Sequence, residues 1–234
     1  PDVAGFKADV SLKPDLQAAA EATLARFGAV HVLVNNAGVG GGGRYGGTQA
    51  TGGGWSDAGW EWLLGVNLMS VVWGVELFGP LIEQAGGGHI VSTASMAGLV
   101  SQSSNPYSVS KYGVVALMEG LRVELSPKRI GVSVLCPGLV ATRIIDAARN
   151  LPARLSAAAR TEPLDAATAA GLAEFRRLLA AGADPDFVGE LVREGIEGDW
   201  PYIFTDTSFE RAVEARFARI REGFDRVRGL SAQR

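Results

Sequence analysis

The sequence predicts an α/β fold in which a parallel sheet carries helices on both faces. Short apolar runs rich in valine and isoleucine alternate with longer segments of helical spacing, a pattern typical of parallel sheets. With 234 residues and 47% hydrophobic content, the chain can bury a substantial core. No internal repeat or interdomain linker is visible, so we predict a single domain over residues 1–234.

The predicted elements follow one another along the whole chain. The apolar pattern predicts strands near residues 5–10, 30–36, 89–94, 130–136 and 201–205. It predicts helices over residues 14–27, 56–85 and 106–126, and Asp184-Pro185 is typical of the cap of a further helix before the last strand. From about Ser208 to Val227 the spacing predicts a final amphipathic helix packed on the body, with an apolar face made of Phe209, Val213, Phe217, Ile220 and Phe224.

The start of the helix at 106–126 carries the most informative residues. Asn105-Pro106 is typical of an N-cap followed by a proline at the first helical position. Tyr107 and Lys111 are then one turn apart and share a face of the helix. The strand at 89–94 ends beside Ser95, and the loop between can bring Ser95 to the same place.

This trio of Tyr107, Lys111 and Ser95 could move a proton to or from an alcohol or carbonyl oxygen. A free tyrosine has a pKa of about 10, and bringing it near 7 requires about 4 kcal/mol. An ammonium at roughly 4 Å supplies about that much at an effective dielectric of about 20, so we expect Lys111 to lower the pKa of Tyr107. Ser95 can donate a hydrogen bond to a substrate oxygen where charge develops. Taken alone, the spacing also fits an ordinary solvated helix face.

Further motifs stand along the rest of the chain. One strand ends in Asn35-Asn36-Ala37-Gly38, Asn67 lies inside a helix, and another strand ends in Cys136-Pro137-Gly138. Together with the trio, these resemble the short-chain dehydrogenase/reductase family in its compact, non-extended branch, from about Phe6 to Thr205. The resemblance implies a Rossmann-like, doubly wound sheet and an NAD(P)-dependent oxidoreductase that interconverts a secondary alcohol and a ketone. A sugar epimerase or dehydratase of the extended branch is a third option, but we expect the roughly 120 residues after Lys111 to be too few for the larger substrate domain of that branch.

The resemblance implies a role for each matching position. Tyr107 would be the general acid/base, Lys111 its partner in setting the pKa, and Ser95 the donor to the substrate oxygen. Asn67 would sit in a local helix distortion and hold a water that links Lys111 to solvent. The cofactor, NAD or NADP, would be held by residues from several places along the chain: Asp9, Val10, Asn36, Ala37, Gly38, Val66, Thr93, Tyr107, Lys111, Pro137, Gly138, Val140 and Thr142.

One family feature is missing from the sequence. Family members begin with a strand, a turn of the form T-G-x-x-x-G-x-G and a helix, whose first amides face the pyrophosphate. Here the chain opens at Pro1, so we expect the first β-α-β unit to be absent and the chain to be part of a longer protein. The alternative is a non-catalytic binding or scaffold protein on the same fold. Gly38–Gly43 formally matches G-x-G-x-x-G, but glycines continue to Gly54, which predicts a mobile loop there.

The composition limits the classes of partner that the protein could bind. A net charge of −3 offers no basic face to a nucleic acid. His31 and His89 have no neighbours at ligand spacing, so no metal site is expected, and the single Cys136 is predicted to be a buried small hydrophobe. The resemblance further implies a homodimer or homotetramer, and we expect a cytoplasmic protein.

The stretch from Trp62 to Ile82 is long and apolar enough to span a membrane. Asn67, Glu76 and three glycines interrupt it, and strands and helices alternate around it. We therefore predict a central helix buried against the sheet and a partner subunit.

Residues 139–183 are predicted to form a substrate lid inserted in the domain. Apolar residues there favour an apolar alcohol or ketone, although ordinary amphipathic helices fit the pattern as well: Leu139, Ile144, Ile145, Leu151 and Leu155. The interleaved arginines could meet an acidic substrate group or lie solvated: Arg143, Arg149, Arg154 and Arg160.

Overall fold

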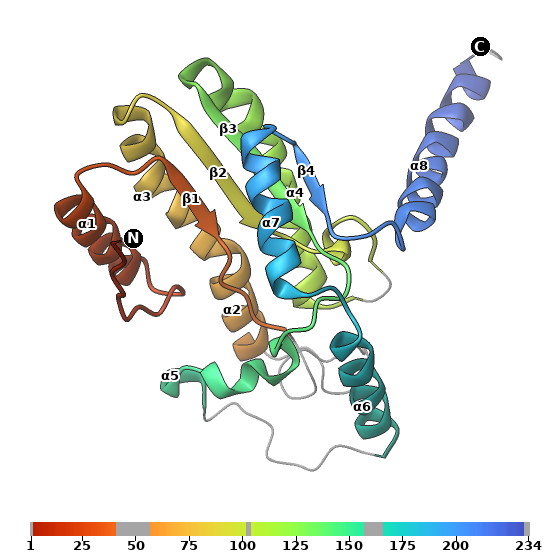
Figure 1. Ribbon diagram of the computed structural model, residues 1–234. Coiled ribbons are helices and arrows are strands. Elements are labelled where there is room, and N and C mark those ends of the chain that lie inside the picture. The colour runs from red at the N-terminus through yellow and green to blue at the C-terminus, as the bar shows by residue number, and fades with distance from the viewer. Residues whose placement is uncertain (1, 41–56, 102–103, 157–165, 232–234) are drawn as a thin grey trace.

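Four parallel strands form the central sheet, in the order β1-β2-β3-β4 (Figure 1). The computed structural model describes residues 2–40, 57–101, 104–156 and 166–231. The strands are β1 (Val32–Asn35), β2 (Gly88–Thr93), β3 (Ile130–Cys136) and β4 (Tyr202–Phe204). The predicted parallel α/β fold is confirmed, and four of the five predicted strands lie where the sequence places them.

The helices alternate with these strands. In chain order they are α1 (Lys13–Phe27), α2 (Asp57–Leu64), α3 (Ser70–Gln84), α4 (Pro106–Leu125), α5 (Ala153–Ser156), α6 (Ala166–Ala180), α7 (Pro185–Glu197) and α8 (Glu210–Ser231). Shorter helical segments are the π-helix η1 (Gly65–Met69) and the 3₁₀ helices η2 (Met96–Gly98), η3 (Ser126–Lys128) and η4 (Ile144–Asn150).

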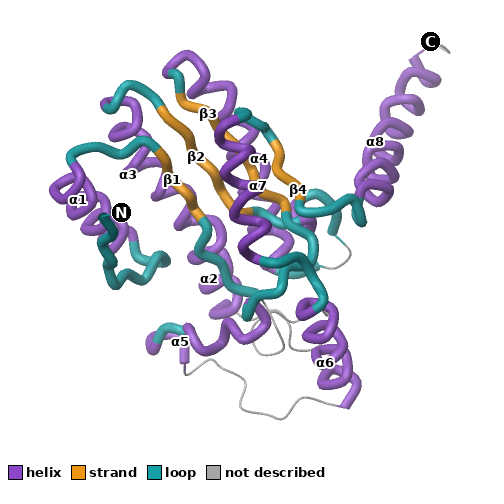
Figure 2. Tube along the Cα trace, in the orientation of Figure 1, coloured by secondary structure: helices purple, strands orange, loops and turns teal. Residues whose placement is uncertain are grey.

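Helices cover both faces of the sheet, and consecutive residues of β2 show it. Ile90 belongs to the core cluster that contains Val114 of α4, whereas its neighbour Val91 belongs to the cluster that contains Val188 of α7. Figure 2 shows α7 on one side of the strands, with α3 and α4 on the other. The alternation of strand side chains thus gives two buried layers rather than one.

The strand predicted near residues 5–10 is wrong. Residues 2–9 form no strand, and Asp9 instead begins the turn into α1. The Ser11 amide donates to the Asp9 carboxylate (3.0 Å), and the Asp9 amide donates to the carboxylate of Asp15 (2.8 Å). These side-chain contacts offer the backbone an alternative to strand pairing, which is a common property of aspartate.

Gly88 lies where β2 passes β1, and this close approach makes its missing side chain important. A Cβ placed there would lie 1.9 Å from the carbonyl oxygen of His31, a backbone atom that cannot turn away. We expect Gly88→Ala to lower the free energy of unfolding by about 3 kcal/mol or more. Gly120, on the exposed side of α4, has open space around it, so Gly120→Ala should be neutral or stabilise by about 0.5–1 kcal/mol. Urea denaturation measures both, and equal stability of the two variants would contradict the steric argument.

The long apolar stretch of the sequence is one continuous helical segment. Asp57–Gln84 has 28 residues and a mean hydropathy of 1.4, so by length and composition alone it could cross a membrane. In the structure it packs against the rest of the chain, with Trp62, Leu63 and Ile82 fully buried. Within this chain 44% of its most apolar stretch is buried.

The final helix differs from its predicted packing. Phe209 and Val213, at its start, do pack against the core, but the apolar residues beyond them are exposed. Figure 1 shows α8 extending away from the sheet. The spacing therefore predicted a helix correctly but placed its apolar face wrongly on this chain's own body.

Candidate active site

The first turns of α4 bring Tyr107 and Lys111 to the carboxyl ends of β2 and β3. Asn105 caps the helix as predicted, since its side-chain oxygen accepts from the Ser108 amide (2.7 Å). The Lys111 ammonium reaches back to β2 and donates to the carbonyl oxygen of Thr93 (2.8 Å). It lies 5.8 Å from the centre of the Tyr107 ring. A capped helix start and a strand end together fix both side chains.

Ser95 completes the trio from the end of β2. Its hydroxyl accepts from the Ala97 amide (3.1 Å) and hydrogen-bonds the Tyr107 side chain. Gly98 lets this segment lie against α4, because a Cβ there would be 2.6 Å from the carbonyl oxygen of Lys111. Three groups that are twelve and four residues apart in sequence therefore meet in one place.

Burial dominates the protonation of this site. Burial raises the pKa of Tyr107, and the hydrogen bond with Ser95 offsets only part of this increase. Burial also lowers the pKa of Lys111 from 10.5 to about 8. Burial therefore sets the net direction of the Tyr107 pKa, and a lowering of that pKa by Lys111 stays a prediction.

Asn67 lies in a helix distortion, as the resemblance implies, because residues 65–69 form the π-helix η1. Its side chain, 1% exposed, holds the chain after β1: Oδ1 accepts from the Val39 amide (2.8 Å) and Nδ2 donates to the Val39 carbonyl (3.0 Å). Nδ2 also donates to Ser110 (3.2 Å), whose hydroxyl donates to the carbonyl oxygen of Tyr107 (2.7 Å). The amide thus ties the β1 loop to the helix that carries the trio. No sequence motif had pointed to Ser110.

The loop after β1 lies next to the trio. Asn36, Ala37 and Gly38 are exposed, and the Thr93 hydroxyl donates to the Asn36 side chain (2.9 Å). A Cβ on Gly38 would lie 3.7 Å from both Asn67 Oδ1 and Lys111 Nζ. Val66 is buried behind this loop together with Val39. Of the adjoining glycine-rich loop, residues 41–56 lie outside the described part of the chain.

The segment after β3 borders the same edge of the sheet. The Pro137 carbonyl accepts from the Met96 amide (3.0 Å), next to Ser95. The Gly138 amide donates to the Thr205 hydroxyl (3.0 Å), which in turn donates to the Asp206 carboxylate (3.0 Å). Sequence reasoning missed these two holding residues, although polar side chains directly after a strand at this edge are a usable signal.

Val140 and Thr142 continue this segment. Val140 pairs with Ala183 in an isolated bridge, and the Thr142 amide donates to the Val140 carbonyl (2.7 Å). Thr142 is exposed. The structure therefore holds Val140 in place while leaving Thr142 accessible.

Asp9 and Val10 lie in the turn that precedes α1. The Asp9 carboxylate accepts from the Ser11 hydroxyl (2.6 Å) and lies 3.5 Å from the guanidinium of Arg154. Val10 packs at the edge of the cluster that contains Val39 and, also at its edge, Tyr107. Asp9 thus already has ionic and hydrogen-bonding partners in this chain.

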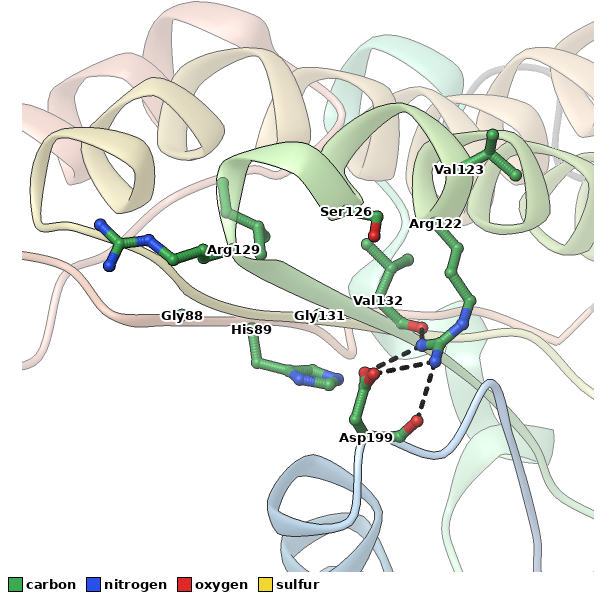
Figure 3. Close-up of a pocket in the computed structure, with 10 residues that line it drawn as sticks. Gly88, His89, Arg122, Val123, Ser126, Arg129, Gly131, Val132 and Asp199 are labelled. Carbon is green, nitrogen blue, oxygen red and sulfur yellow. Dashed lines mark hydrogen bonds and ion pairs between the residues drawn. The ribbon is translucent and has the colours of Figure 1, made fainter.

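An open pocket of about 550 Å³ lies at the opposite end of the strands, away from every predicted site residue (Figure 3). It is lined by the starts of β2 and β3 and by Asp199. The Arg122 guanidinium spans it, donating to Asp199 (2.9 Å) and to the Val132 carbonyl (2.7 Å). Arg122 and Asp199 already form an ion pair with each other, so we assign this pocket a structural role. The trio remains the candidate site.

Comparison with known proteins identifies the family. The sequence model of the short chain dehydrogenase family matches residues 1–151, well over half of the chain. The chain belongs to the short-chain dehydrogenase family. A short-chain dehydrogenase of this kind is an oxidoreductase, and the whole trio lies within the matched region.

One solved structure and one curated dehydrogenase resemble the chain over most of its length. A short chain dehydrogenase/reductase from Burkholderia phymatum, solved in complex with NAD, is 36% identical, with a TM-score of 0.84 over 94% of this chain and 77% of that one. The 2-(R)-hydroxypropyl-CoM dehydrogenase of Xanthobacter autotrophicus is 32% identical over 81% of this chain and 75% of its own length.

Cyclohexanol dehydrogenase of an Acinetobacter strain is 36% identical over 61% of this chain. The match spans only 55% of that enzyme, and the match to the C alpha-dehydrogenase of a Sphingobium strain spans 52% of its length. The chain thus spans about half the length of these two relatives.

Proposed function

We propose that the protein is an NAD(P)-dependent oxidoreductase that interconverts a secondary alcohol and a ketone, with Tyr107 as the general acid/base. The observation that carries this proposal is the meeting of Tyr107, Ser95 and a buried Lys111 at the carboxyl edge of the sheet. In doubly wound folds, this edge is where ligands bind. Family membership and relatives named as alcohol dehydrogenases support the same reaction class.

The residues at this edge fit a nicotinamide cofactor. Lys111 carries three N–H donors, one of which meets Thr93, and it faces the exposed backbone at Gly38. That arrangement suits the hydroxyls of a ribose, and the small side chain of Ala37 leaves room for close approach. The relative solved with NAD also supports this cofactor. We assign its binding to Asn36, Ala37, Gly38, Val66, Thr93, Tyr107, Lys111, Pro137, Gly138, Val140 and Thr142, with Asp9 and Val10 at the far end.

The chain's own groups would handle the proton, while NAD(P), when bound, supplies the hydride chemistry. In ketone reduction the Tyr107 hydroxyl gives its proton to the carbonyl oxygen, and in alcohol oxidation the phenolate takes it back. Ser95, already hydrogen-bonded to Tyr107, donates to the same substrate oxygen and fixes its place. Lys111, with a pKa of about 8, is positioned to favour the phenolate.

The substrate is proposed to be apolar, with the part of 139–183 that the structure describes acting as its lid. Leu155 and Ala147 are buried together with Trp62, in the cluster whose edge includes Tyr107. Of the predicted arginines, Arg154 pairs with Asp9 and Glu61, Arg143 pairs with Asp146, and Arg149 donates to the Arg143 carbonyl, while Arg160 lies outside the described residues. This pairing argues against an acidic substrate group.

Ser95→Ala tests the proposed site. The wild-type protein should oxidise NADH or NADPH in the presence of alicyclic and aliphatic ketones, followed by absorbance at the nicotinamide band. Loss of one donor to the developing oxyanion should lower kcat about 10²-fold. The exposed Ser126, at the other end of the strands, gives a control: Ser126→Ala should keep full activity. Cofactor binding without turnover of any alcohol or ketone would instead favour a non-catalytic binding protein.

A further inference from the structure

The final helix α8 is fixed at its base and exposed along the rest of its length. Val213 packs against the core, and the guanidinium of Arg216 lies 5.3 Å from the centre of the Tyr112 ring on α4. From residue 217 to residue 230 every position is exposed. Figures 1 and 2 show this part of the helix extending away from the sheet. A helix held at one end in this way is preformed for a partner, which lowers the ordering cost of binding.

Apolar residues run along α8 as a narrow seam. Their spacing alternates between four and three residues: Val213, Phe217, Ile220, Phe224 and Val227. Three large members are well exposed, Phe217 by 55%, Ile220 by 44% and Phe224 by 63%. An average spacing of about 3.5 residues is typical of the seam of a two-stranded coiled coil, whereas a helix lying on a sheet or a membrane shows a wider apolar face.

We propose that α8 is a self-association helix, which pairs with α8 of a second copy of this chain in antiparallel orientation. In that pairing Phe217 faces Val227 of the partner subunit, and Ile220 faces Phe224 of the partner subunit. The charges beside the seam select this orientation. Glu214 then lies opposite Arg228 of the partner subunit, and twofold symmetry makes this pair twice.

The alternative arrangements are less favourable. A parallel pair would set Arg216 opposite Arg221 of the partner subunit, two like charges, with no acidic partner for either. In the antiparallel pair the two Arg221 side chains approach across the symmetry axis, which offsets part of the gain. A membrane surface is disfavoured because acidic residues, Glu222 and Asp225 among them, are mixed into the polar face.

The mass of the full chain in solution tests the seam. Sedimentation velocity over a concentration series should show assembly by the wild type. Phe224→Asp should halve the mass at concentrations where the wild type is assembled, and raise the dissociation constant about tenfold or more. Phe187→Asp changes a phenylalanine that is 51% exposed on α7, outside the seam, and should leave the mass unchanged. Circular dichroism checks that α8 keeps its helix in both variants.

A charge-exchange series tests the orientation. Glu214→Arg and Arg228→Glu should each weaken association roughly threefold to tenfold at low salt, and the double variant should recover wild-type affinity. Only the antiparallel pairing brings these two positions together, so failure of the double variant to recover would overturn it. Equal mass of wild type and Phe224→Asp at all concentrations would overturn self-association. Binding of monomers to phosphatidylglycerol vesicles through the same seam would also overturn self-association, and would identify a lipid surface as the partner of α8.

Discussion

Tyr107→Phe is expected to lower kcat by about 10²–10⁴-fold, the usual contribution of a positioned general acid/base. The substitution removes only the hydroxyl that hydrogen-bonds Ser95 and keeps the ring that packs at the edge of the Val39 and Trp62 cluster. Since the substitution keeps the ring of this proposed cofactor-binding residue, NADH affinity should fall much less than kcat. Steady-state turnover measures the first effect, and fluorescence titration of NADH measures the second.

Tyr112→Phe is the matched control for this variant. Tyr112 lies on the same helix, and its hydroxyl donates to the carbonyl oxygen of Leu99 (2.7 Å), away from the trio. Removing that hydroxyl should cost about 1 kcal/mol of stability and leave kcat unchanged. Turnover that survives Tyr107→Phe but falls in Tyr112→Phe would reverse the proposed assignment of the base.

Lys111→Met is expected to abolish turnover while making the protein more stable at pH 7. Lys111 is 2% exposed, and burial lowers its pKa from 10.5 to about 8. Keeping the ammonium charged at neutral pH therefore costs the fold about 3 kcal/mol. The variant avoids this cost but loses the hydrogen bond to Thr93, which contributes about 1 kcal/mol. Its free energy of unfolding should therefore exceed that of the wild type by about 2 kcal/mol.

The pH dependence of stability separates this effect from simple repacking. Between about pH 8 and pH 10.5 the unfolded chain binds more protons at Lys111 than the native chain, so the wild type gains stability as pH rises through that window. The advantage of Lys111→Met should accordingly shrink by about 2 kcal/mol between pH 7 and pH 9.5 in urea denaturation.

Lys128→Met provides the control for the pH series. Lys128 is a surface residue paired with Glu83 (2.7 Å), so its loss should change stability by at most about 1 kcal/mol. A Lys111→Met variant that is less stable than the wild type at pH 7, with a gap that does not change with pH, would contradict the cost assigned to the buried charge.

Sequence patterns sufficed where the signal is local. The cap at Asn105 and Pro106 fixed the start of α4, and therefore the shared face of Tyr107 and Lys111, because capping depends on a few adjacent residues. Strand β3 was predicted to its last residue, since its run of buried apolar side chains ends sharply at a proline. The strand expected near residues 5–10 failed for the opposite reason: the side chain of Asp9 competes for the backbone there.

Contacts between distant segments could not be predicted in the same way. Asn67 accepts a hydrogen bond from the Val39 amide, and Thr205 accepts one from the Gly138 amide. Both bonds join residues far apart in sequence, and no local pattern marks either pair. The protonation of Tyr107 is a similar case. Helical spacing predicts that a lysine lies near the tyrosine. It does not predict how deeply the fold buries the two side chains, and this burial shifts both pKa values.

By itself the sequence determined the order of the elements, the family and the three groups that meet at the end of β2. Periodicity, caps and motif spacing encode these features within short windows of the chain. Only the tertiary structure decided the depth at which Lys111 is buried and the direction in which α8 leaves the body. Both depend on which surfaces the folded chain covers, and that is a property of packing between segments far apart in sequence.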